Sequence, residues 1–209
     1  MSTAFAGDSS CSSSRATRAP RGARLVYLMG ASGSGKDTLL RLVRASLAPG
    51  EPVLVAHRYI TRPSGGDEAS VFLSDTEFER RKAMGCFALH WDSHGLRYGI
   101  GVEIDAWLAR GATVIVNGSR AHLAVAHARY PGLAAVEIRV APDVLAARLA
   151  RRGRETPDQI RARLQRAARP FDLPAGHTVT RLANDGLPEE AAQRLLAVVR
   201  DRLAPSPGA

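Results

Sequence analysis

The sequence has few cysteines and few aromatic residues, and it contains no long apolar run. Its two cysteines, Cys11 and Cys86, provide neither a disulfide framework nor the spacing of a metal site. Aromatic residues make up 5% of the chain, which argues against a stacking platform for single-stranded nucleic acid. No stretch approaches the length of a membrane span. We therefore expect a globular protein of the reducing cytoplasm, without a membrane partner.

Acidic residues are too few to balance the basic ones, and the formal net charge is +9. Such an excess indicates anionic partners. Eight arginines lie between Arg148 and Arg169, opposed only by Glu155 and Asp158. We interpret this cluster as a lid that closes over small phosphates, because the chain offers no reading helix or aromatic stripe for specific nucleic-acid binding. A solvated basic helix is the alternative interpretation.

The length of 209 residues suits one domain. Residues 1–22 are rich in serine, alanine and arginine and lack the apolar core of a secretory signal. We expect them to form a disordered extension, and residues 204–209 to form a loose tail. The folded domain is expected over residues 23–203.

Short apolar runs alternate with segments of helical periodicity, which predicts an α/β fold around a parallel five-stranded sheet flanked by helices. The expected strands are 24–30, 53–60, 112–118, 133–140 and 177–182. The expected helices are 36–47, 75–83, 102–110, 120–129, 142–153, 154–169 and 188–203. Residues 85–101 mix apolar and polar residues with interior glycines, which predicts an irregular, partly stranded binding region.

The stretch GASGSGKD, residues 30–37, has the spacing G-x-x-x-x-G-K between a predicted strand and a predicted helix. Backbone N–H groups of such a loop wrap phosphates, and the helix directs its positive end at them. Lys36 is expected to reach the β- and γ-phosphates and to act in catalysis. The residues expected to bind ATP here are Gly30, Ala31, Ser32, Gly33, Ser34, Gly35, Lys36, Asp37 and Thr38.

Two positions depart from the usual magnesium ligands of such a loop. Asp37 stands where a serine or threonine normally follows the lysine, and the strand 112–118 carries Asn117 where an aspartate is usual. We interpret Asp37, with Thr38, as the Mg²⁺ ligand set, because a carboxylate beside Mg²⁺ meets a cation before it meets the phosphates. The alternative is that Asp37 only favours the helix dipole and Thr38 supplies the hydroxyl.

From the phosphate loop to RLARRGRETPDQIRARLQRA, residues 24–203 resemble the guanylate kinase branch of the P-loop NTPases, which is nucleoside-monophosphate-kinase-like. The segments GASGSGKD, AHRYITR, HGLRYGIGVEID and VNGSRAHL resemble, more narrowly, the ribose 1,5-bisphosphate phosphokinase family of phosphonate catabolism. This resemblance implies transfer of the γ-phosphoryl group of ATP to ribose 1,5-bisphosphate, giving 5-phosphoribosyl 1-diphosphate (PRPP). It also implies an acceptor-binding insertion over about 57–101 and an arginine-rich lid over about 148–166.

The acceptor region lacks polar groups that would read guanine. Compared with guanylate kinases, Arg62 and Glu68 remain, but Gly65 replaces a phosphate-binding arginine and Ile100 replaces a hydroxyl residue. Such a site would leave the amide edge of guanine unpaired. His57, His90 and His94 are candidates to bond sugar hydroxyls, with ordinary structural hydrogen bonds as the alternative. The residues expected to bind the phosphorylated sugar are Arg58, Arg62, Glu68, Arg97, Tyr98, Asn117 and Arg120.

The resemblance implies that Arg148, Arg152 and Arg163 close over the transferring phosphoryl group together with Lys36. No general base is needed, because the acceptor is already a phosphate dianion. Asn184 and Asp185 are expected near adenine, and simple turn chemistry is their alternative. Guanylate kinase, a non-catalytic binding module and a nucleic-acid binder remain rival functions. The sequence leaves the oligomeric state open, with a homodimer as one option.

Overall fold

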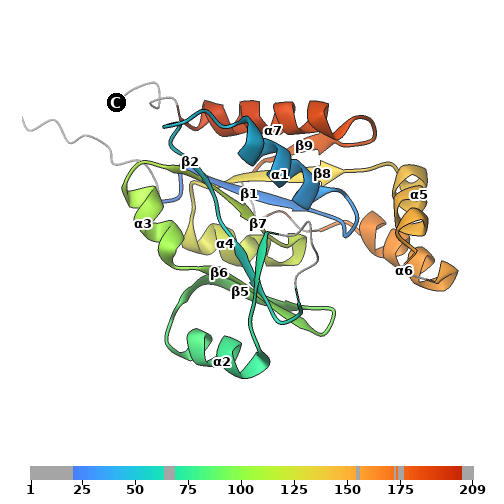
Figure 1. The fold of residues 1–209 in the computed structure, drawn as a ribbon, viewed down its shortest axis with the longest axis horizontal. Helices are drawn as coiled ribbons and strands as arrows, with labels where there is room; N and C mark the ends of the chain where they lie inside the picture. Colours follow the sequence, from blue (N-terminus) through green and yellow to red (C-terminus); the bar gives the residue numbers. More distant parts are fainter. Residues whose placement is uncertain (1–20, 64–68, 154–155, 172, 174–176, 204–209) are drawn as a thin grey trace, which may run out of the picture.

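The fold is built on a five-stranded parallel sheet with the strand order β2–β7–β1–β8–β9 (Figure 1). A computed structural model describes residues 21–63, 69–153, 156–171, 173 and 177–203, without the side chain of Arg152. All four neighbouring strand pairs of this sheet are parallel, as the alternating pattern predicts. The strands are β1 (Leu25–Gly30), β2 (Val53–Val55), β7 (Thr113–Asn117), β8 (Ala134–Arg139) and β9 (Val179–Ala183).

Helices cover both faces of this sheet, which explains why β1 is apolar along its whole length. Val26 and Leu28 point into the core beneath α1 (Lys36–Ser46) and α7 (Pro188–Asp201). Leu25 and Tyr27 point into the opposite core, which is shared with α3 (Glu103–Ala109) and α4 (Leu123–Arg129). A single 3₁₀ turn, η1 (Arg120–His122), precedes α4, where the sequence suggested one continuous helix.

A second sheet, of order β4–β3–β6–β5, stands beside the first and corrects two predictions. The single strand expected over 53–60 breaks into β2, which pairs with β7, and β3, which pairs with β6. The region expected to be irregular and partly stranded is stranded over most of its length, as an antiparallel hairpin of β5 and β6 whose register shifts between Phe87 and Leu89. Helix α2 (Asp75–Ala83) packs here through Phe78, whose ring stacks on that of Phe87. The strands are β3 (Arg58–Ile60), β4 (Ser70–Phe72), β5 (Phe87–Ser93) and β6 (Leu96–Gly101).

Two helices, α5 (Pro142–Arg152) and α6 (Pro157–Ala168), project from the sheet near the carboxyl end of β8 (Figure 1). Each has a proline in its first turn, and a capping box of Thr156 and Gln159 begins α6. The expected extension falls largely outside the described residues and the expected tail wholly outside. Within the described ranges, no helix is both long and apolar enough to cross a bilayer.

Candidate active site

The P-loop connects β1 to α1 and is shaped by close approaches that need glycine. Gly30 has φ 155°, and a Cβ there would lie 2.6 Å from the carbonyl oxygen of Ile138. Gly35 has φ 88°, and its Cβ would lie 2.6 Å from Nδ2 of Asn184. Lys36 Nζ donates to the carbonyl oxygens of Gly30, at 2.8 Å, and Ala31, at 3.0 Å. The lysine is therefore held across the loop, and its expected contact with the phosphates stays a prediction.

Asn184 and Asp185 support this loop and the start of α5. Asn184 is 1% exposed, and its Nδ2 donates to the carbonyl oxygen of Ser34 at 2.8 Å. Oδ1 of Asp185 accepts from the backbone N–H of Ala141, the residue that precedes α5, at 2.6 Å. The turn after β9 thus joins the P-loop to the lid. Its expected position near adenine stays a prediction.

Asp37 and Asn117 meet between the first turn of α1 and the end of β7. Asn117 Nδ2 donates to Oδ1 of Asp37 at 3.0 Å, and Nη2 of Arg58 lies 4.0 Å from the same oxygen. Asn117 is 3% exposed, and its Oδ1 has no hydrogen-bond partner among the described residues. A carboxylate beside a buried amide oxygen that lacks a donor fits Mg²⁺, which prefers oxygen ligands. Thr38 is half-buried in the same helical turn.

Of the residues predicted to bind the acceptor, Arg58 and Tyr98 lie together, whereas Arg97 and Arg62 contact other groups. Tyr98 stacks on Trp91 with ring centroids 5.5 Å apart, and the Arg58 guanidinium lies 5.2 Å from the Tyr98 centroid. This stack orients Arg58 toward Asp37. Arg97 forms ion pairs with two carboxylates of α2, those of Asp75 and Glu79, at 3.5 and 3.2 Å. Arg62 donates to the carbonyl oxygen of Pro63 at 3.4 Å. Glu68 and Gly65 lie outside the described residues.

The lid contacts both the P-loop and the acceptor side. Nη1 of Arg163, on α6, donates to Oγ of Ser32 at 3.2 Å. The guanidinium of Arg148, on α5, approaches Gly35: its Nη1 lies 4.0 Å from the position that a Cβ of Gly35 would occupy. Nη1 of Arg166 contacts Nδ1 of His94, at the tip of the β5–β6 hairpin, at 3.0 Å. The side chain of Arg152 is not among those described.

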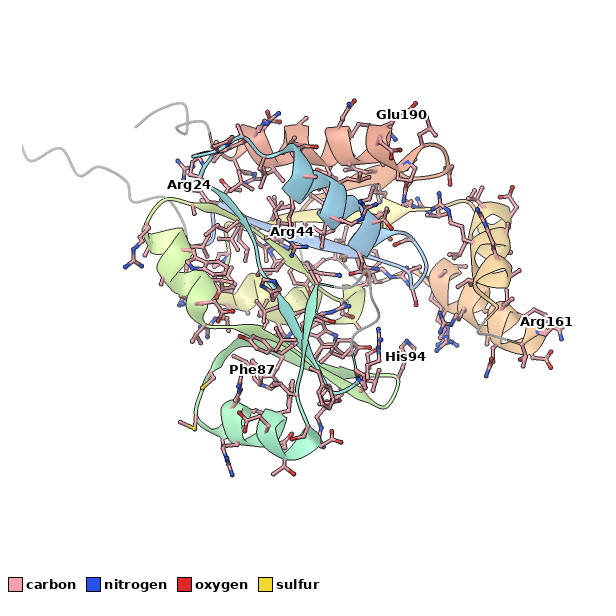
Figure 2. All side chains as sticks on the ribbon, viewed as in Figure 1. Arg24, Arg44, Phe87, His94, Arg161 and Glu190 are labelled. Atoms are coloured by element: carbon pink, nitrogen blue, oxygen red, sulfur yellow. The ribbon has the colours of Figure 1, made fainter. Side chains whose placement is uncertain are left out.

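Figure 2 shows His94 on the side of the hairpin that faces α6, whereas Arg161 lies on the outer side of that helix. Burial, followed by the charges of Arg166 and Arg163, lowers the pKa of His94. A neutral imidazole can accept a hydrogen bond from Arg166, and an imidazolium cannot. The contact is therefore complete above the ordinary histidine pKa of about 6.5 and is lost as the pH falls toward the lowered value.

We expect acid to weaken the wild-type lid contact but not that of His94→Asn. Asparagine keeps an acceptor, does not titrate and tolerates the positive φ of 55° at this position. The ratio of wild-type to variant kcat/KM, in which titration of the substrates cancels, should be constant above about pH 7 and fall below about pH 6. A ratio that stays flat down to pH 5 would mean that the contact does not affect turnover.

No family model matches the sequence, but individual proteins do. It is 63% identical to ribose 1,5-bisphosphate phosphokinase PhnN of Achromobacter xylosoxidans over 183 residues, which cover 88% of this chain and 95% of that protein. The chain belongs to the PhnN family. The protein of the same name from Burkholderia mallei is 54% identical, over 84% of this chain and 95% of the relative.

A solved structure supports the fold independently. The guanylate kinase of Anaplasma phagocytophilum superposes with a TM-score of 0.61 at 14% identity, covering 90% of this chain and 89% of that one. At 14% identity, the superposition is evidence for the fold only. The predicted fold class, a guanylate-kinase-like P-loop kinase, is confirmed.

Sequence reasoning missed one charged cluster near the lid. Glu137 is 7% exposed on β8, and its carboxylate lies between Arg120 and Arg181. A glutamate inside the otherwise apolar run AAVEI was a detectable signal, because a buried carboxylate needs cationic partners. The sequence could not show which arginines supply them.

Proposed function

We propose that the protein transfers the γ-phosphoryl group of ATP to ribose 1,5-bisphosphate and releases ADP. The observation that carries this proposal is the 63% identity, over 88% of the chain, to a relative named for that activity. Two features give the proposal a physical basis. Lys36 lies in the P-loop, hydrogen-bonded to the loop carbonyls, and the lid carries arginines. The reaction would take place among soluble cytoplasmic metabolites and would supply PRPP, with phosphonate breakdown as its expected source of substrate.

In the proposed reaction, an oxygen of the C1 phosphate of the sugar forms a bond to the γ-phosphorus of ATP. The bond from that phosphorus to the β–γ bridging oxygen breaks, and ADP leaves with the electron pair. Lys36 and the lid residues Arg148 and Arg163 would neutralise charge on the phosphoryl oxygens. No proton has to be removed from the attacking phosphate oxygen. The task of the protein is therefore alignment, charge neutralisation and exclusion of water.

Asp37 would hold Mg²⁺, with Asn117 and Thr38 completing the protein ligands. When bound, Mg²⁺ would offset the negative charge of the phosphates. The Oδ1 of Asn117, unpartnered among the described residues and next to the Asp37 carboxylate, supports this role, whereas Asn117 Nδ2 and Arg58 would have to share or release Oδ1 of Asp37 when the metal binds. Arg58 is thereby placed where it could contact a phosphate of the acceptor as well.

The second sheet supports a base-free acceptor. Ile100 and Leu89 are cross-strand neighbours on β6 and β5, and both are buried in the apolar core. Both side chains are apolar, so position 100 offers guanine no hydroxyl of the kind that guanylate kinases carry there. Arg58 and Arg62 remain as cations for the phosphates of a sugar.

An assay that couples ADP release to NADH oxidation tests the substrate directly. We expect kcat/KM for ribose 1,5-bisphosphate to exceed that for GMP by at least about 100-fold. ATP without an acceptor is the control for hydrolysis. Turnover of GMP with none of the bisphosphate would identify a guanylate kinase instead, and release of no ADP with either acceptor would favour a non-catalytic module.

A further inference from the structure

The last turn of α6 is held by a side chain from the core of the protein. Arg120, which follows β7, donates from Nη1 to the carbonyl oxygen of Ala167 at 2.9 Å and from Nη2 to that of Arg166 at 3.1 Å. The last carbonyl groups of a helix lack an N–H partner within the helix; here that of Arg166 also accepts from the backbone N–H of Arg169, at 3.3 Å. The two ends of one planar guanidinium therefore cap α6 from outside the lid.

Arg120 is itself fixed by the buried carboxylate of Glu137. Oε1 of Glu137 lies 3.8 Å from Nη1 of Arg120, and Oε2 lies 3.4 Å from Nε of Arg181. Glu137 sits on β8, an interior strand that pairs with β1 on one side and β9 on the other, so its backbone is held by the sheet. A buried carboxylate is stable only when cations compensate it, which holds the Arg120 guanidinium in place. The orientation of Arg120 is therefore set before it meets α6.

Apolar packing within α6 itself is sparse, although Phe171, just beyond the helix, packs against the core. All of α6 is described, and none of its residues is buried. A cavity of about 430 Å³ separates Leu164 and Ala167 of α6 from Ile138 and Arg181 of the sheet. Among the described residues, the hydrogen bonds of Arg120 therefore give the last turn of α6 a polar link to the core, beside the apolar contact of Phe171.

The same helix carries the contact to the P-loop. Arg163 lies one turn before Ala167 and donates to Oγ of Ser32. We infer that Arg120 is a positioning residue of the phosphoryl-transfer reaction: by anchoring the last turn of α6, it sets where Arg163 stands over the P-loop. The inference rests on the proposed function, and it assigns to the lid a side chain that the sequence suggested for acceptor binding.

The decisive variant is Arg120→Ala, compared with Arg24→Ala as a matched control. Arg24 Nη1 donates to the carbonyl oxygens of Arg202 and Leu203 at the end of α7, so its loss uncaps a helix away from the lid. We expect Arg120→Ala to lower kcat about 10- to 100-fold, because displaced catalytic groups align poorly. The ratio of ATP hydrolysis to phosphoryl transfer should rise about 10-fold, since a misplaced lid admits water. Arg24→Ala should leave this ratio unchanged.

Affinity for ADP, measured by calorimetry without acceptor, separates the lid role from a direct contact with the sugar. The inference predicts weaker ADP binding by Arg120→Ala. Arg120→Lys should restore ADP affinity only in part, because it keeps the charge but loses the pair of fixed N–H donors of the guanidinium. An unchanged hydrolysis ratio with unchanged ADP affinity would overturn it, whether or not the acceptor KM rises. If the wild type fails to phosphorylate the bisphosphate, the proposed function fails, whereas ADP affinity still tests Arg120.

Discussion

Lys36→Met should lower kcat/KM by about 100- to 1000-fold while the protein stays folded. The ammonium group is the P-loop cation expected to follow charge on the transferring phosphoryl group, and loss of one such preorganised donor has a cost of this size. Methionine keeps the length of the side chain, so the packing around the stem should survive. The coupled assay measures the loss, and the thermal unfolding midpoint reports on folding.

Lys82→Met is a matched control, because Lys82 is the other lysine of the chain and lies in α2. Among the described residues, its Nζ forms an exposed ion pair with Glu79, at 3.8 Å. Surface pairs of this kind contribute little to stability, so activity and unfolding midpoint should both match the wild type. Lys36→Met that keeps more than a tenth of wild-type kcat/KM would contradict the proposed role of this ammonium.

The features that the sequence predicts well are those encoded in one contiguous stretch. The P-loop needs a strand, a glycine-rich turn and a helix in immediate succession, and residues 25–46 supply them in that order. The parallel sheet is likewise visible in short runs that are apolar on both faces. Each of these signals depends on local backbone preference and on burial, and both can be read from neighbouring residues.

The features that the sequence leaves open depend on contacts between distant segments. The sequence of residues 53–60 is typical of one continuous strand. Only the pairing of its first half with β7 and of its second half with β6 divides it between two sheets. Arg120 is separated from the carbonyl of Ala167 by 47 positions, and Asn117 from Asp37 by 80. The sequence suggests that an arginine near a phosphate site binds the substrate. It does not reveal that the guanidinium of Arg120 instead donates to carbonyl groups at the end of a helix.

Moving the carboxylate from position 37 to position 117 should separate the two interpretations of Asp37. Asp37→Thr removes the carboxylate, and we expect the Mg²⁺ concentration for half-maximal activity to rise about 10- to 100-fold. Asn117→Asp alone places a second carboxylate where Nδ2 donates to Asp37 Oδ1 at 3.0 Å, and like charges at that distance should destabilise the loop.

The double variant Asp37→Thr/Asn117→Asp restores a hydroxyl after Lys36 and a carboxylate at the end of β7, the arrangement usual in P-loop enzymes. We expect it to recover activity to within about tenfold of the wild type. Binding of Mn²⁺ in the presence of ADP, followed by electron paramagnetic resonance, should weaken in Asp37→Thr and return in the double variant. If Asp37→Thr binds Mn²⁺ as the wild type does, a hydroxyl suffices as the ligand, and unchanged binding in Asp37→Ala, which offers no ligand, would assign the carboxylate to the helix dipole and the metal to Thr38. If the double variant binds Mn²⁺ no better than Asp37→Thr, a carboxylate at the end of β7 cannot replace that of Asp37. The two positions would then not be equivalent metal sites.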